Sequence, residues 1–266
     1  MDVPVIADAA AWTVRWSPRP AAAVRLFCLP HTGGGAGVYR HWATRLDPRI
    51  ELRCVRLPGR ESRFRERPYA GLDELVPALV DAVAPELDGP HAWFGHSMGA
   101  LLAYEVCREL ERRGLPRPVR LLVAGRRAPH LPDRAAPVHA APTEQLLAHL
   151  AELNGTPDEL LQHPGLLGTV LPMLRADFSV SETYRWRPGP ELAVPVSVFG
   201  GTDDPVADLA ELTAWRLHTS AGCTVRQFPG HHFFLHQDPH PVVDAVSGAL
   251  LPPDQHPAGG RDDRAA

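Results

Sequence analysis

Residues 91–102 have the sequence His-Ala-Trp-Phe-Gly-His-Ser-Met-Gly-Ala-Leu-Leu. The apolar run Ala-Trp-Phe predicts a short buried strand, and the residues after the second glycine predict a helix. Between them lies Gly-x-Ser-x-Gly, which in this strand–turn–helix context is typical of a nucleophile elbow. Gly95 and Gly99 stand where a side chain would collide with the neighbouring strand and helix. We therefore predict Ser97 at the apex of a strained turn, with the Met98 amide able to point at an oxyanion.

The rest of the chain alternates predicted strands with predicted helices. Short apolar runs bounded by Gly and Pro predict the strands, and apolar residues at helical spacing predict the helices. After a short edge strand or hairpin within 1–20, the predicted strands are 24–29, 50–57, 92–94, 119–124, 192–199 and 224–228. The predicted helices are 38–46, 72–87, 98 to about 113, 207–217 and 242–250. This order predicts an α/β fold with a mostly parallel sheet and helices on both of its faces.

One long segment, from about 127 to 186, interrupts the alternation with helical patterns only. Its predicted helices are 144–153, 157–161 and 166 to about 184. An insertion at this point would cover the active-site edge of the sheet as a lid, packing on the main domain and lining a substrate channel with its apolar side chains: Leu146, Leu147, Leu150, Leu166, Leu167, Leu171, Met173, Leu174 and Phe178. We expect one domain over 1–251 and a disordered tail over 252–266, which is rich in Pro, Gly, Asp, Arg and Ala.

Loops after three predicted strands carry the residue types of a catalytic triad. Along the chain, Ser97 precedes the acids Asp203 and Asp204, which precede His231 and His232. A serine hydroxyl needs a base to take its proton, an imidazole suits that task near neutral pH, and a carboxylate fixes the imidazole tautomer. The carboxyl ends of parallel strands meet at one edge of a sheet, where such sites are built. The order and spacing alone choose neither between the two aspartates nor between the two histidines.

Two more loops are predicted at the same edge. The first, 30–35, is Pro-His-Thr-Gly-Gly-Gly. It lacks the Lys-Ser/Thr pair of a phosphate-binding P-loop, so we interpret it as a loop that turns a backbone amide toward a reacting carbonyl. The second loop contains Arg60 and Arg63. Two hypotheses remain for them: they grip an anionic substrate handle, or they form solvated ion pairs with Glu61.

Composition excludes several classes of protein. The 266 residues carry a formal net charge of −4 without a run of basic residues, which argues against nucleic acid as a partner. No apolar run reaches the roughly 18 residues of a membrane span, and residues 1–4 do not resemble a signal peptide. Four widely spaced cysteines, without a Cys-x-x-Cys pair, predict free thiols and a cytoplasmic protein: Cys28, Cys54, Cys107 and Cys223.

No metal site is expected from the sequence. His232, His236 and His240 recur every four residues, a spacing that would align them on one helix. Pro239 and Pro241 make a continuous helix there improbable, however. His96, inside the elbow motif, is expected to pack beside the turn.

Several blocks of sequence, spread over roughly 20–250, resemble the type II thioesterases. These are discrete α/β hydrolases that work beside modular polyketide synthases and nonribosomal peptide synthetases. The blocks are Leu-Pro-His-Thr-Gly-Gly-Gly at 29–35, Leu-Pro-Gly-Arg at 57–60, Phe-Gly-His-Ser-Met-Gly at 94–99, Phe-Gly-Gly-Thr-Asp-Asp-Pro at 199–205 and Phe-Pro-Gly-His-His-Phe-Phe-Leu at 228–235. The segment Leu-Pro-Met-Leu-Arg-Ala-Asp-Phe at 171–178 is also similar to the lid of this family.

The resemblance implies an α/β-hydrolase fold and a set of site residues. The family's acid matches Asp204 and its histidine matches His232, while the Met98 amide and that of Thr32 would form the oxyanion hole. Thr32 and His231 stand where the family often has a smaller residue. Thioesterase domains fused to synthases often carry their acid after the strand that follows the elbow helix. That strand here ends Val-Ala-Gly-Arg at 123–126, with no acid nearby.

The implied activity is hydrolysis of acyl groups from the phosphopantetheine arm of acyl or peptidyl carrier proteins, by a monomer without a cofactor. Alternatives are the dedicated release of one pathway intermediate, a small-ester esterase, and a carrier-binding scaffold without enzymatic activity. A scaffold would be favoured by loss of a triad member, and Ser97, Asp204 and His232 are all present.

Overall fold

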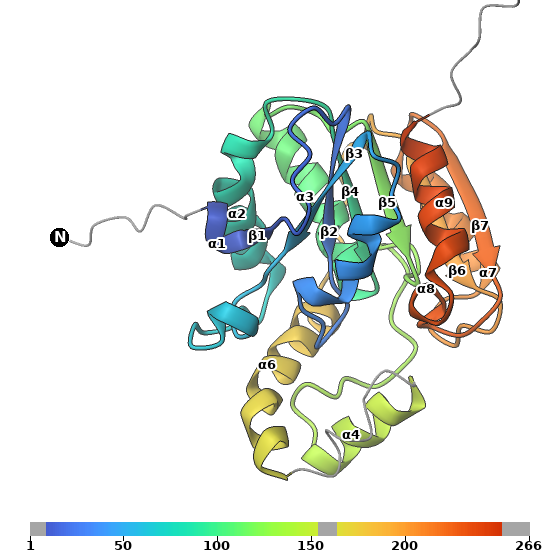
Figure 1. Ribbon diagram of the computed structural model, residues 1–266. Helices are drawn as coiled ribbons and strands as arrows, with labels where there is room; N and C mark the ends of the chain where they lie inside the picture. Colours follow the sequence, from blue (N-terminus) through green and yellow to red (C-terminus); the bar gives the residue numbers. More distant parts are fainter. Residues whose placement is uncertain (1–8, 154–163, 252–266) are drawn as a thin grey trace, which may run out of the picture.

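A computed structural model describes residues 9–153 and 164–251. Within them, seven strands form one sheet in the order β1-β3-β2-β4-β5-β6-β7 (Figure 1). Their bounds are β1 Thr13–Val14, β2 Val24–Leu29, β3 Ile50–Val55, β4 His91–His96, β5 Arg120–Ala124, β6 Val196–Gly201 and β7 Cys223–Phe228. β1 pairs antiparallel with β3, and the other neighbours are parallel. The predicted mostly parallel sheet is confirmed.

Helices cover both faces of this sheet (Figure 1). Side chains alternate between the faces along each strand, so Trp93 packs with α2 and α3, whereas Phe94 packs with η1 and α9. The α-helices outside the lid are α1 Ala9–Trp12, α2 Leu72–Val83, α3 Met98–Arg113, α7 Leu209–Thr213, α8 Phe234–Gln237 and α9 Pro239–Leu250. The 3-10 helices are η1 Ala36–Thr44, η2 Glu61–Arg63, η3 Ala84–Glu86 and η4 Ala214–His218.

Several boundaries differ from the prediction for identifiable reasons. The strand expected from residue 192 begins at Val196, because Pro195 has no amide to donate to the sheet. The helix expected over 207–217 begins at Leu209, because Asp208 caps it in a capping box with Glu211, and it continues as η4. The helix expected over 38–46 is the 3-10 helix η1, and the helix expected over 72–87 is α-helical only to Val83 and ends in the 3-10 helix η3.

Between β5 and β6, the described part of the lid contains the helices α4 Thr143–Glu152 and α6 Pro164–Glu182. They lie side by side at one end of the molecule, and α6 reaches the main domain, where Val180 packs in the core with residues of α3 (Figure 1). Five of the predicted apolar positions form a separate small core: Leu146, Leu150, Met173, Leu174 and Phe178. The helix predicted at 157–161 and the tail at 252–266 lie outside the described residues.

Two other expectations concern the described residues only. Cys28, Cys54 and Cys107 are buried free thiols, and Cys223 is a half-buried one, as predicted. None of the helices described is both long and apolar enough to span a bilayer.

Candidate active site

The turn between β4 and α3 has the geometry expected of a nucleophile elbow. Ser97 stands between the end of β4 and the first residue of α3, with φ 55° and ψ −114°. This is a strained conformation for a residue with a side chain. A Cβ atom at Gly95 would lie 2.0 Å from the carbonyl oxygen of Gly99, and one at Gly99 would lie 2.3 Å from that of Leu29. The two glycines therefore permit the close approach of strand, turn and helix.

A buried histidine–carboxylate pair lies at the same sheet edge. His232 Nδ1 is 3.1 Å from each carboxylate oxygen of Asp204, and the two side chains are 2% and 0% exposed. Asp203 is exposed and accepts a hydrogen bond from the Thr202 hydroxyl. His231 is also exposed, and its ring faces the Asp203 carbonyl. The sequence left open which aspartate and which histidine form a pair. In the structure the two buried ones, Asp204 and His232, contact each other.

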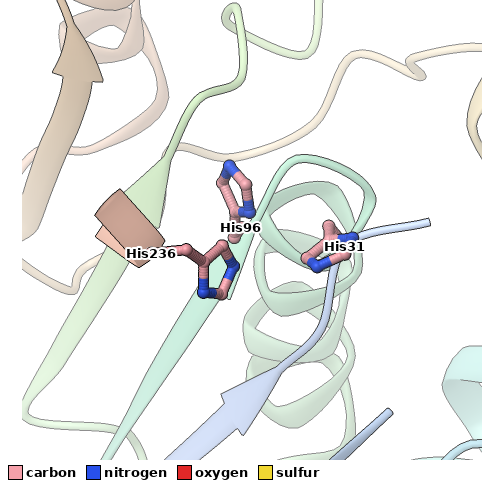
Figure 2. Close-up of side chains that lie close together, drawn as sticks. All are labelled: His31, His96 and His236. Atoms are coloured by element: carbon pink, nitrogen blue, oxygen red, sulfur yellow. The ribbon is translucent and has the colours of Figure 1, made fainter. Parts of the chain in front are cut away.

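His96 is buried beneath the elbow, where its place in the motif predicts packing. Its Nε2 lies 2.9 Å from the carbonyl oxygen of His232. Figure 2 shows the His96 ring beside those of His31 and His236, which come from two other elements. Burial lowers the pKa of His31 and of His236 to about 4, and lowers that of His96 well below its usual value.

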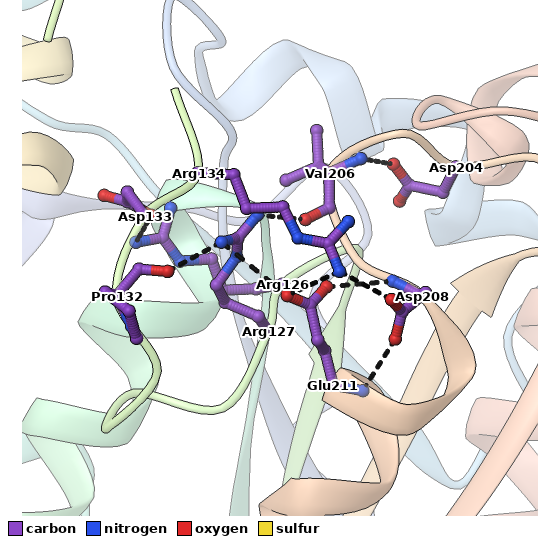
Figure 3. Close-up of polar contacts among 9 residues, drawn as sticks. All are labelled: Arg126, Arg127, Pro132, Asp133, Arg134, Asp204, Val206, Asp208 and Glu211. Carbon is purple, nitrogen blue, oxygen red and sulfur yellow. Dashed lines mark hydrogen bonds and ion pairs between the residues drawn. The ribbon is translucent and has the colours of Figure 1, made fainter. Parts of the chain in front are cut away.

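Arginines of the segment after β5 bind the loop that contains Asp204 and the helix that follows this loop (Figure 3). The Val206 amide donates to Asp204 Oδ1 at 2.8 Å, and the Val206 carbonyl accepts from Arg127 Nη2 at 2.7 Å. Arg134 Nη2 lies 2.9 Å from Glu211 Oε1, which ties the same segment to α7. Arg127 could not be predicted from the sequence, because nothing in the residues around it distinguishes it from the other arginines of the chain.

The loop after β2 contains Thr32, and the lid fixes its position. The Gly33 amide donates to Asp177 Oδ2 of α6 at 2.8 Å. Arg60 Nη1 donates to the Gly34 carbonyl at 2.7 Å and to the same Asp177 oxygen at 2.9 Å. The predicted oxyanion loop is therefore bound to both the lid and the loop after β3. Met98 begins α3, and its side chain is fully buried.

Of the two hypotheses for Arg60 and Arg63, ion pairs with Glu61 are wrong for both residues. Arg60 pairs with Asp177, and Arg63 pairs with Glu66 at 2.6 Å. The Glu61 carboxylate has other partners: it accepts a hydrogen bond from the Gly37 amide at 2.9 Å and lies 3.3 Å from Arg56 Nε. Protein carboxylates therefore neutralise the guanidiniums of both Arg60 and Arg63, which argues against the hypothesis that these two residues grip an anionic substrate.

A cavity of about 330 Å³ opens beside Ser97 and His232. Thr32 lines it from the sheet edge, and Leu150 and Phe178 line it from the lid. This volume is in the range of small-molecule sites, and the lid supplies its apolar wall. The geometry therefore brings Ser97, Thr32 and His232 to one cavity, with Asp204 directly behind the histidine.

Sheet, elbow and buried pair together define the α/β-hydrolase class. Residues 24–250 match the family "Thioesterase domain", and this chain belongs to that family. It is 41% identical over 252 residues to the thioesterase PikA5 of Streptomyces venezuelae, which covers 94% of this chain and 89% of that protein. It is 36% identical over 239 residues to the gramicidin S biosynthesis protein GrsT of Aneurinibacillus migulanus, covering 90% of this chain and 93% of the relative.

Solved structures agree with this assignment. The thioesterase RedJ, from the prodiginine pathway of Streptomyces coelicolor, has a TM-score of 0.82 and 38% identity, covering 88% of each chain. The predicted family resemblance and α/β-hydrolase fold are confirmed. The chain is a thioesterase whose relatives belong to polyketide and nonribosomal peptide pathways.

Proposed function

We propose that this thioesterase removes acyl groups from the phosphopantetheine arm of acyl or peptidyl carrier proteins, through a Ser-His-Asp acyl-enzyme mechanism. The observation that carries the proposal is the buried His232–Asp204 pair, 3.1 Å apart, at the cavity that Ser97 lines from a strained elbow. The pathways named for the relatives supply the substrate class, because modular synthases hold their intermediates as thioesters on carrier proteins.

The proposed reaction has two halves. Ser97 Oγ attacks the thioester carbonyl while His232 takes the hydroxyl proton, and Asp204 holds the imidazole in the required tautomer. The tetrahedral intermediate then collapses, and the pantetheine sulfur leaves with the proton from His232. Water, deprotonated by His232, attacks the acyl-serine and releases the free acid and the Ser97 hydroxyl.

Backbone amides stabilise the oxyanion in this proposal. The Met98 amide lies at the N-terminus of α3, where the helix dipole favours negative charge. The Thr32 amide is the second proposed donor, held by the contacts that fix the Gly33 loop to the lid. Loss of one such donor typically lowers turnover by about 100- to 1000-fold.

The chain supplies every proposed catalytic group itself, so we propose a monomer that needs neither a second subunit nor a cofactor. Its four cysteines are free, which suits a reducing compartment, and we propose a cytoplasmic location. The apolar lid wall suits an acyl chain, with the carrier protein docked outside the cavity.

Hydrolysis of one acyl group in three forms tests the proposal. The acyl group is presented on a carrier protein, on a free pantetheine mimic and as a simple ester. We expect the highest kcat/KM for the carrier-bound form and activity on several short acyl chains. Strong preference for one elaborate chain would indicate dedicated release of an intermediate. Equal rates on esters and carriers would contradict the proposed partner.

A further inference from the structure

Three histidines from separate elements converge beneath the proposed active site. His31 lies in the loop after β2, His96 ends β4, and His236 lies in α8. Their potential ligand nitrogens all lie within 4.8 Å of one another. Figure 2 shows each ring turning one nitrogen toward the space between them.

The ring arrangement is close to a three-histidine metal tripod. The centroid of His31 is 5.5 Å from that of His96 and 5.4 Å from that of His236, and the last two are 5.9 Å apart. The ring planes cross steeply, at 75°, 74° and 69°. With Zn–N bonds of about 2.0–2.1 Å, a tetrahedral ion would hold imidazole centroids about 5.2 Å apart and nitrogens about 3.3 Å apart. Small ring movements would therefore complete the tripod.

Backbone carbonyls orient two of the imidazoles for coordination. The Nε2–H of His96 donates to the His232 carbonyl at 2.9 Å, which leaves the lone pair on Nδ1. The Nδ1–H of His31 donates to the Thr32 carbonyl at 2.9 Å, which leaves the lone pair on Nε2. Metal-binding histidines usually carry such a hydrogen bond from the other ring nitrogen.

The inward nitrogens also lack partners within the described residues. His96 Nδ1 and His236 Nε2 are buried and make no hydrogen bond to them. The His96 side chain is fully buried, so its nitrogen has no compensating access to solvent. Burial lowers the pKa of all three rings, which favours the neutral form that binds metals.

We propose that His31, His96 and His236 form a binding site for one zinc ion, and that the bound ion slows thioester hydrolysis. A set of three imidazoles suits zinc, and the fourth position remains for water. His31 directly precedes Thr32, and His96 directly precedes Ser97. Drawing the three nitrogens together would therefore shift the elbow relative to the oxyanion loop. This inhibition rests on the proposed function, whereas zinc binding does not.

The three clustered histidines are not the three whose regular spacing was considered, and rejected, as a metal site in the sequence. The four-residue spacing joined His236 to His232 and His240, whereas the structure joins it to two residues far away in the sequence. Asp238 lies between α8 and α9 with an extended backbone, so the helix is interrupted there and His240 does not share a helix with His236. The sequence-based expectation of no metal stays a prediction, and the zinc titration described below decides between it and the proposed site.

Calorimetric titration of the full chain with zinc, after removal of bound metal with EDTA, tests binding directly. We expect one high-affinity ion per chain, and a tetrahedral visible spectrum when cobalt(II) replaces zinc. His236→Gln and His31→Gln should each weaken zinc binding by about 100-fold. The control His240→Gln alters an exposed histidine outside the cluster and should bind zinc like the wild type.

Hydrolysis assays with and without zinc complete the test. Zinc should slow hydrolysis by the wild type and by His240→Gln, and should have at least tenfold less effect on His236→Gln. Circular dichroism checks that the variants fold. If His236→Gln does not fold, His31→Gln is compared with the wild type instead. Absence of a high-affinity ion in the wild type, or unchanged binding in both cluster variants, would overturn the site. Zinc binding without any thioester hydrolysis would leave the site standing and contradict the proposed function.

Discussion

Arg60 and Asp177 form a buried two-armed ion pair that joins the lid to the sheet. Arg60 Nη1 lies 2.9 Å from Asp177 Oδ2, and Nη2 lies 2.6 Å from Oδ1. The side chains are 6% and 3% exposed. The same aspartate accepts the Gly33 amide at 2.8 Å, so one carboxylate connects α6, the loop after β3 and the proposed oxyanion loop.

Replacing Asp177 with Asn should destabilise the protein strongly. Removal of one charge from a buried pair leaves Arg60 uncompensated, which typically costs about 3–5 kcal/mol. Urea denaturation measures this loss. The control Asp73→Asn breaks an ion pair with Arg187 whose side chains are 83% and 77% exposed, and it should change the free energy of unfolding by less than about 1 kcal/mol. Equal losses in the two variants would contradict the role given to the buried pair.

The adjacent aspartates should respond differently to the same change. Asp204→Asn removes the carboxylate that orients His232, and by analogy with serine hydrolases it should lower kcat by about 10⁴-fold. Asp203→Asn changes an exposed side chain that contacts Thr202, and it should retain kcat within a few-fold. Kinetics on an acyl-loaded carrier compare the two. The reverse order of effects would move the proposed acid by one residue.

Two glycines in helices should tolerate alanine very differently. At Gly99 the added Cβ would meet the backbone of Leu29 at 2.3 Å, which cannot move without the strand, so Gly99→Ala should cost about 1–3 kcal/mol and most of the activity. At Gly248 in α9 nothing lies within 4 Å, and Gly248→Ala should add about 0.5–1 kcal/mol of stability. Thermal unfolding of both variants is the measurement. A stable, active Gly99→Ala variant would refute the tight elbow.

Stability should fall between pH 6.5 and about 4, in part through His218. Burial and the neighbouring His130 and Arg108 lower the pKa of His218 to about 4. In this pH window the unfolded chain binds a proton that the folded chain excludes, so the free energy of unfolding decreases as the pH falls. This histidine contributes at most about 1.4 kcal/mol per pH unit.

His218→Gln should therefore flatten the pH dependence of stability. Urea denaturation at pH 7, 5.5 and 4.5 gives the slope for the variant and the wild type. Because the variant also loses the contact between Tyr104 Oη and His218 Nδ1, 3.1 Å, its stability at pH 7 should be lower. An unchanged slope would show that His218 does not titrate as described.

The sequence predicted well those features that depend on residues close together in the chain, such as the elbow and the individual strands and helices. The elbow was visible because a strand, two glycines and a helix follow one another within twelve residues. The parallel sheet followed from the alternation of apolar runs with helical patterns. Residue types at strand ends also pointed to Asp204 and His232, although only the family resemblance chose them from their neighbours.

Contacts between distant segments could not be predicted in the same way. Arg60 and Asp177 are 117 residues apart, and nothing in the local pattern of either predicts their pairing. The cluster of His31, His96 and His236 likewise exists only because β2, β4 and α8 end at one place. At β6, Pro195 overrode an apolar pattern that alone predicted a longer strand.

Ser97, at the apex of the elbow, is the proposed nucleophile, and kinetics of a serine-to-alanine variant test this role. The initial rate of hydrolysis of an acyl-loaded carrier protein is compared for the wild type, Ser97→Ala and the exposed-serine control Ser62→Ala. We predict that Ser97→Ala lowers kcat by about 10⁶-fold and forms no acyl-enzyme by mass spectrometry, while Ser62→Ala matches the wild type. Turnover by Ser97→Ala within tenfold of the wild type would show that Ser97 is not the nucleophile.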